Sequence, residues 1–142
     1  MKTLNKYGKE AIDKAGGVNS VTDVTGFGLL GHALEMAMGS NVTIKINSKD
    51  VPIIKGAVEY ANLGLIPAGA YSNRNYIGDR VYFKEDIPKY LEDIFYDPQT
   101  SGGLLISISK DNVDSLLTAL KNSPTEYGII GEVHEKDEID GK

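Results

Sequence analysis

Helical and extended patterns alternate along the whole chain, and this alternation is the strongest constraint on its fold. Apolar residues recur at helical spacing in five segments, at 4–15, 27–38, 53–64, 88–96 and 113–120. Extended patterns separate or follow them, at 18–25, 42–46, 81–83, 103–108 and 127–133. Such alternation is typical of a sheet covered by helices. The predicted class is α+β with a mixed sheet, because several connections are too short or irregular for strict parallel winding.

Residues 67–80 lack a clear apolar period and are predicted to form the longest loop. The segment contains proline, glycines, asparagines and tyrosines. Long ordered loops often carry function. Arg74 in this segment could face an anion, although a solvated surface arginine is the more common outcome.

Size and composition exclude several classes of protein. The chain has 142 residues, which suits a single domain, and it contains no cysteine, so it has no disulfide framework, thiolate metal site or cysteine nucleophile. A net charge of −5 argues against a nucleic-acid partner. No apolar run approaches the roughly 20 residues of a membrane span, and residues 1–6 lack an apolar signal core. These features predict a cytoplasmic protein without a membrane partner.

The first candidate site is a glycine-rich turn at residues 22–32, which read TDVTGFGLLGH. A glycine turn before a helix can direct backbone N–H groups toward an anion. Asp23 offers the oxygen ligand that Mg²⁺ prefers. The alternative is an ordinary turn in which Asp23 or Thr25 caps the helix, and capping alone already accounts for these residues. His32 in the same segment is more typical of packing or hydrogen bonding than of catalysis.

Gly26, Gly28 and Gly31 also match the spacing of a dinucleotide-binding fingerprint, but the match is weak. That fingerprint follows a well-formed strand and precedes an acidic residue at the end of the next strand. Here the preceding segment is polar, and Asp50 falls beyond the end of the next predicted strand.

The second candidate site lies at residues 97–105, which read DPQTSGGLL. Its Asp-Pro and Gly-Gly pairs are explained by a tight turn into a strand. Its polar residues could instead line a cleft beside the first glycine turn. They are Asp97, Gln99, Thr100 and Ser101.

These two motifs resemble the C-terminal half of the selenophosphate synthetase (selenide, water dikinase) family. Three shorter matches occur in the same order, at residues 63–69, 73–76 and 130–133. The resemblance covers roughly residues 3–134, nearly the whole chain. Either motif alone would also fit relatives in the same purine-synthetase-like superfamily, and the pair points to the selenium branch. The fold implied is that of the C-terminal domain of aminoimidazole ribonucleotide synthetase-like proteins.

The resemblance implies an enzyme that converts selenide, ATP and water to selenophosphate, phosphate and AMP. It assigns Asp23 as a Mg²⁺ ligand and Thr25, Gly26 and Gly28 to the cleft around the triphosphate, and it carries over no catalytic residue. The polar residues of the second motif receive a supporting role. Mg²⁺ is the implied cofactor and ATP a substrate.

The resemblance also implies an incomplete enzyme. Residues 1–134 correspond to one C-terminal-type domain, residues 135–142 to a charged, frayed tail, and no N-terminal ATP-binding domain is present. The expected partners are that domain and, in the complete enzyme, a second subunit of a homodimer. The chain alone is expected to be inactive. Two alternatives remain: a non-catalytic binding or assembly module, and a domain of a purine synthetase, thiamine-monophosphate kinase or hydrogenase maturation factor.

Overall fold

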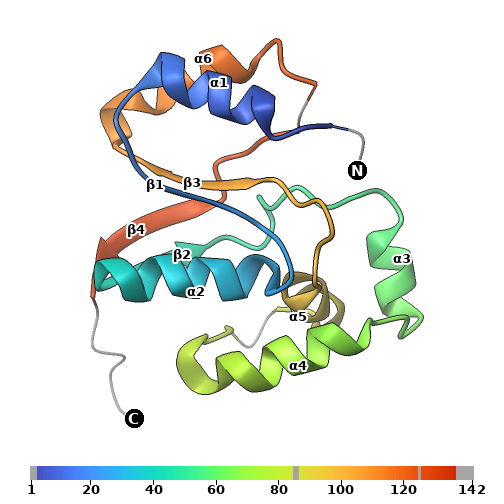
Figure 1. Ribbon diagram of the computed structural model, residues 1–142. Helices are drawn as coiled ribbons and strands as arrows, with labels where there is room; N and C mark the ends of the chain where they lie inside the picture. Colours follow the sequence, from blue (N-terminus) through green and yellow to red (C-terminus); the bar gives the residue numbers. More distant parts are fainter. Residues whose placement is uncertain (1–2, 85–86, 125, 137–142) are drawn as a thin grey trace.

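The computed structural model describes residues 3–84, 87–124 and 126–136, and its elements stack in layers (Figure 1). The helices are α1 (Lys6–Ala15), α2 (Gly28–Ser40), α3 (Ala57–Asn62), α4 (Ala68–Ile77), α5 (Lys89–Tyr96) and α6 (Val113–Leu120). The strands are β1 (Val18–Asp23), β2 (Val42–Ile46), β3 (Leu104–Ile108) and β4 (Gly131–Glu135). The described residues also form two short 3-10 helices, η1 (Gly78–Arg80) and η2 (Lys110–Asn112).

The described strands form two antiparallel pairs. β1 pairs with β3, which places Asp23 opposite Leu104, and β2 pairs with β4, which places Ile46 opposite Gly131. The predicted α+β class is confirmed. The sheet differs in one respect, because the strands pair as two separate two-stranded sheets instead of one mixed sheet. Helix α2 contacts strands of both pairs, namely β1, β3 and β2.

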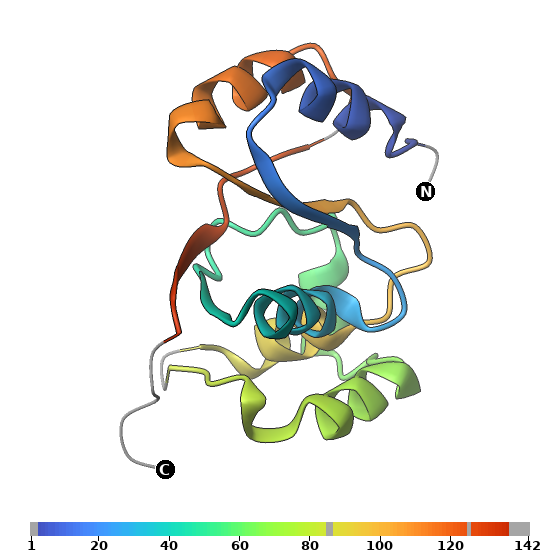
Figure 2. The ribbon, with the colours of Figure 1, turned by 60° about the vertical axis from the view of Figure 1, so that its left-hand side comes forward.

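The β1–β3 pair divides the hydrophobic core into two parts. Helices α1 and α6 lie on one face of this pair and α2 on the other (Figures 1 and 2). Side chains alternate across a strand, so Leu105 joins the larger core beside α2, whereas Ile106 and Ile108 pack against the smaller one. The smaller core is built on Ala11 and Leu116. The β1–β3 pair is therefore covered on both faces, and this packing fixes the position of the end of β1, at Asp23.

The segment predicted to be the longest loop is instead helix α4, so that prediction was wrong. Ala70, Asn73 and Ile77 are its buried residues, and their spacing is that of one helical face. Ile77 is only 1% exposed. The pattern is hard to see in the sequence because a buried asparagine stands where an apolar residue is expected.

Two smaller predictions also differ from the structure. Residues 81–83 form no strand; Val81 and Phe83 pack against the larger core, so burial explains their alternation without a strand partner. The last strand lies at β4 instead of 127–133, because β2 pairs only with residues 131–135.

The predicted tail falls mostly outside the described residues. Glu135 lies at the end of β4, whereas residues 137–142 are not described. Within the described ranges, no helix has both the length and the hydropathy that crossing a membrane requires.

Candidate functional site

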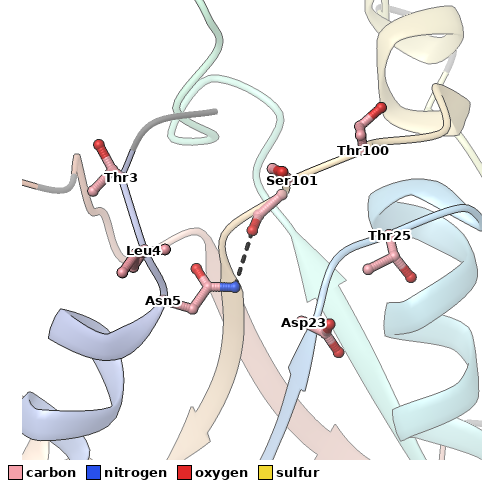
Figure 3. Close-up of a pocket in the computed structure, with 8 residues that line it drawn as sticks. Thr3, Leu4, Asn5, Asp23, Thr25, Thr100 and Ser101 are labelled. Atoms are coloured by element: carbon pink, nitrogen blue, oxygen red, sulfur yellow. Dashed lines mark hydrogen bonds between the residues drawn. The ribbon is translucent and has the colours of Figure 1, made fainter.

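An open pocket of about 250 Å³ lies where the two polar motifs meet (Figure 3). It is bounded by the segment before α1, the end of β1 and the loop before β3. The described residues that line it are Thr3, Leu4, Asn5, Asp23, Thr25, Thr100, Ser101 and Gly102. Both motifs that the sequence singled out therefore contribute to one site, although 64 residues, 33–96, separate them in the chain.

Backbone hydrogen bonds hold the two motifs together at the pocket. The Val24 amide donates to the Gly103 carbonyl at 2.9 Å, and the Gln99 amide donates to the Thr25 carbonyl at 3.0 Å. The first bond continues the β1–β3 ladder beyond its last strand pair, Asp23 and Leu104, and the second adds a contact outside the ladder register. The relative position of the motifs is thus determined by main-chain atoms, which makes it rigid.

Gly28 shapes the turn from behind the pocket. It is buried and has a φ of +70°, a conformation that favours glycine. A β-carbon on it would lie 2.9 Å from the carbonyls of Tyr96 and Asp97. Gly26 is exposed, and a β-carbon there would meet nothing within 4 Å. Neither glycine is among the described residues that line the pocket.

Asn73 on α4 ties this turn to the end of α5. Its side-chain amide donates to the carbonyls of Gly26 and Tyr96, both at 2.9 Å. The side chain is buried, with the residue 7% exposed. The bond to Tyr96 is buried and the bond to Gly26 is part-buried. Asn73 therefore supplies the partner that the buried Tyr96 carbonyl needs, and it fixes the backbone between Asp23 and α2. The sequence marked Asn73 only as part of the shorter family match at residues 73–76, without a structural role.

The segment before α1 closes the other side of the pocket. Asn5 Nδ2 donates to the Gly102 carbonyl at 3.2 Å (Figure 3). Asn5 stands where a helix cap would be expected, but its side chain makes no cap. Sequence reasoning missed Thr3, Leu4 and Asn5 because their contact with residues 100–102 is long-range.

Asp23 contributes the single carboxylate among the eight described lining residues. It is exposed at the end of β1. Its neighbours in the pocket are hydroxyls and a carbonyl, and oxygen ligands of this kind fit Mg²⁺. No group of three or more acidic, histidine or cysteine side chains that could hold a metal occurs among the described residues. The lining therefore fits Mg²⁺ as one wall of a site that needs further carboxylates.

Thr25 is held by His32 from inside helix α2. Thr25 Oγ1 lies 3.1 Å from His32 Nε2, and His32 Nδ1 lies 3.2 Å from Glu35 Oε2. His32 is 8% exposed. The expectation that His32 packs and hydrogen-bonds is confirmed, and its contact with Thr25 links it to the pocket.

Asp97 lies behind the pocket at the end of α5. Its Oδ1 is buried and has no hydrogen-bond partner among the described residues. Burial raises the pKa of the Asp97 carboxyl above its ordinary value. Unpartnered buried oxygens are rare in folded proteins. The burial of this oxygen disfavours the charged form of the carboxyl. Thr100 and Ser101 of the same motif do line the pocket.

Arg74 is half-buried and pairs with carboxylates of helix α5. Its Nη2 lies 2.7 Å from Asp93 Oδ1 and 3.5 Å from Glu92 Oε2, and its guanidinium lies over the Tyr96 ring at 4.9 Å. The anionic groups that Arg74 faces in the structure are carboxylates of this chain, and Arg74 is not a fully solvated surface residue. It joins α4 to α5.

The chain matches a known protein family over its full length. The family model described as "AIR synthase related protein, C-terminal domain" matches residues 1–142. Curated proteins named "Selenide, water dikinase" are also similar to the chain. The protein from Clostridioides difficile is 52% identical over 136 residues, which is 95% of this chain and 39% of that protein.

Two further relatives carry the same name. The protein from Caldanaerobacter subterraneus subsp. tengcongensis is 49% identical over 99% of this chain and 40% of its own length. The protein from Treponema denticola is 48% identical over 85% of this chain and 35% of its own length. The chain thus spans about two fifths of the length of the curated relatives it matches.

Proposed function

The chain belongs to the family of the AIR synthase related protein, C-terminal domain, and from this membership we propose that it forms the C-terminal part of a selenide, water dikinase. The complete enzyme would convert selenide, ATP and water to selenophosphate, phosphate and AMP. The relatives are named for this activity, and they agree with the resemblance of the two motifs to selenophosphate synthetase. These relatives are more than twice as long as the chain. The activity is therefore proposed for the complete enzyme and not for this chain alone.

The observation that carries the proposal is the meeting of both motifs in one pocket. Asp23 and Thr25 come from the first motif, and Thr100, Ser101 and Gly102 from the second. Main-chain hydrogen bonds fix the two motifs against each other. A rigid, oxygen-rich pocket is suited to phosphoryl transfer, in which positioning and charge neutralisation dominate.

In this proposal Asp23 binds Mg²⁺, and Thr25, Gly26 and Gly28 shape the cleft around the triphosphate of ATP. When bound, Mg²⁺ would neutralise the charge of the phosphates. The exposed carboxylate of Asp23 at the end of β1 suits this role. Gly28 acts indirectly, because it is buried behind the turn. Asp97, Gln99, Thr100 and Ser101 support the turn and the pocket wall.

The proposal includes partners and an organisation. Residues 1–134 form one domain of the C-terminal type, which works beside an N-terminal ATP-binding domain. That domain supplies the further carboxylates that a Mg²⁺ site requires. The complete enzyme is proposed to be a cytoplasmic homodimer.

The chain alone is expected to be inactive, because one carboxylate is too few for a tight Mg²⁺ site. The test measures AMP formation from ATP and selenide by this chain and, in parallel, by the full-length protein that contains it. Turnover by the longer protein only is the expected result. Robust turnover by the chain alone would overturn the half-enzyme interpretation, and inactivity of both would overturn the proposed function.

A further inference from the structure

A buried imidazole connects the pocket to a carboxylate on the surface of helix α2. His32 is in contact through both ring nitrogens, with Thr25 at 3.1 Å and Glu35 at 3.2 Å. Its ring also meets Phe27 in a T-shaped arrangement, with centroids 5.8 Å apart. The His32 side chain is 10% exposed, so the imidazole has little freedom to turn. Glu35 is half exposed, with 51% of its side chain accessible.

Glu35 determines which ring nitrogen carries the hydrogen. An ionised carboxylate only accepts hydrogen bonds, so His32 Nδ1 must donate to it. A neutral imidazole has one donor and one acceptor nitrogen. Nε2 is then the acceptor, and the Thr25 hydroxyl donates its hydrogen to it.

The direction of the hydrogen bond between Thr25 and His32 determines whether the Thr25 hydroxyl donates or accepts in the pocket. Thr25 lines the pocket next to Asp23 (Figure 3). With its hydrogen directed to His32, Oγ1 offers only lone pairs to a ligand. Asp23 likewise offers only acceptors when ionised. This wall of the pocket therefore attracts a group that donates hydrogen bonds or carries positive charge, and it repels a bare phosphate oxygen.

We propose that His32, oriented by Glu35, is a positioning residue that fixes Thr25 as a hydrogen-bond acceptor, so that the Asp23–Thr25 wall takes a hydrated cation. Where the cation is Mg²⁺ bound with ATP, the inference rests on the proposed function. It changes the role of Thr25 from a direct contact of the triphosphate to a contact of the cation's hydration shell.

The first test reads the tautomer of His32 in this chain by ¹⁵N NMR at about pH 8, above the ordinary pKa range of imidazole. Hydrogen on Nδ1 is expected. Hydrogen on Nε2 would overturn the proposal. The chain has two histidines, and a His134→Gln variant assigns their signals. Glu35→Ala removes the acceptor for Nδ1–H and is expected to raise the Nε2–H population.

The second test measures the Mg²⁺ concentration for half-maximal AMP formation, at saturating ATP, in the full-length protein that contains this chain. Thr25→Val is expected to raise it roughly five- to tenfold, the effect of one lost hydrogen bond. Thr25→Ser, which keeps the hydroxyl, is expected to match the wild type. A purely structural role would lower the amount of folded protein without moving this concentration.

The two tests separate the failure of this inference from the failure of the proposed function. A Thr25→Val variant with an unchanged Mg²⁺ requirement would overturn the positioning role, even if the tautomer is as expected. A wild-type protein that forms no AMP would contradict the proposed function instead. In that case the NMR measurement still decides whether Glu35 and His32 fix Thr25 as an acceptor.

Discussion

Asn73 donates a hydrogen bond of 2.9 Å to the carbonyl of Gly26, across 47 residues of chain. A second bond of 2.9 Å reaches the Tyr96 carbonyl. One buried amide thereby ties helix α4 to the glycine turn and to the end of α5. Asn73 on α4 therefore helps to hold the turn that follows Asp23 in position.

Replacing Asn73 should therefore destabilise the fold. Asn73→Ala leaves two carbonyls without their partner, and we expect a loss of about 2–3 kcal/mol in the free energy of unfolding. Urea unfolding of the chain measures it. Asn75→Ala is the matched control, because Asn75 is exposed on the same helix. Equal effects of the two variants would contradict the role given to Asn73.

The two glycines of the first motif should respond differently to alanine. Gly28→Ala combines a φ of +70° with a β-carbon 2.9 Å from the Tyr96 carbonyl, and we expect a loss of about 2–4 kcal/mol. Gly26→Ala meets open space and should change stability by no more than about 0.5 kcal/mol. Urea unfolding of both variants provides the comparison. A Gly28→Ala protein as stable as Gly26→Ala would show that the turn can shift freely.

Asp97 should make the chain less stable as the pH rises. Burial raises its pKa in the folded state, so between about pH 3.9, the ordinary value, and the raised pKa the folded state holds a proton that the unfolded state has released. Stability then falls as the pH rises through this window and stays lower above it. Asp97→Asn removes the effect, and the variant should be the more stable protein at neutral pH.

The measurement is the difference in unfolding free energy between wild type and Asp97→Asn from pH 3 to pH 7. The advantage of the variant is expected to grow with pH. Asp111→Asn, at an exposed position on η2, controls for the general effect of removing a carboxylate. A difference that stays constant or shrinks with pH would contradict the assignment.

The sequence pattern predicted the elements whose apolar residues repeat regularly. Helices α1, α2, α3, α5 and α6 and strands β1, β2 and β3 lie within or close to their predicted ranges. Helix α4 was missed because Asn73 occupies its buried face and satisfies distant carbonyls. Residues 81–83 were predicted as a strand because burial against helices gives the same alternation as a strand does.

The candidate site could be predicted in part from its two motifs. Asp23 and Thr25 and, from the second motif, Thr100 and Ser101 do lie together. Asn5 could not be predicted, because its bond to Gly102 spans 97 residues. Glu35 left a local signal, the i to i+3 spacing from His32 on a helix. The link from His32 to Thr25 needed the geometry of the turn.

Asp23 is proposed to bind the metal of an ATP-dependent enzyme. The most direct test is selenide-dependent AMP formation by the full-length protein that contains this chain, compared between wild type and Asp23→Asn. The matched control is Asp13→Asn, at an exposed position on α1 whose carboxylate pairs with Lys9. We expect Asp23→Asn to lower turnover by about 100-fold or more and Asp13→Asn to leave it unchanged. Wild-type turnover by Asp23→Asn would contradict the account.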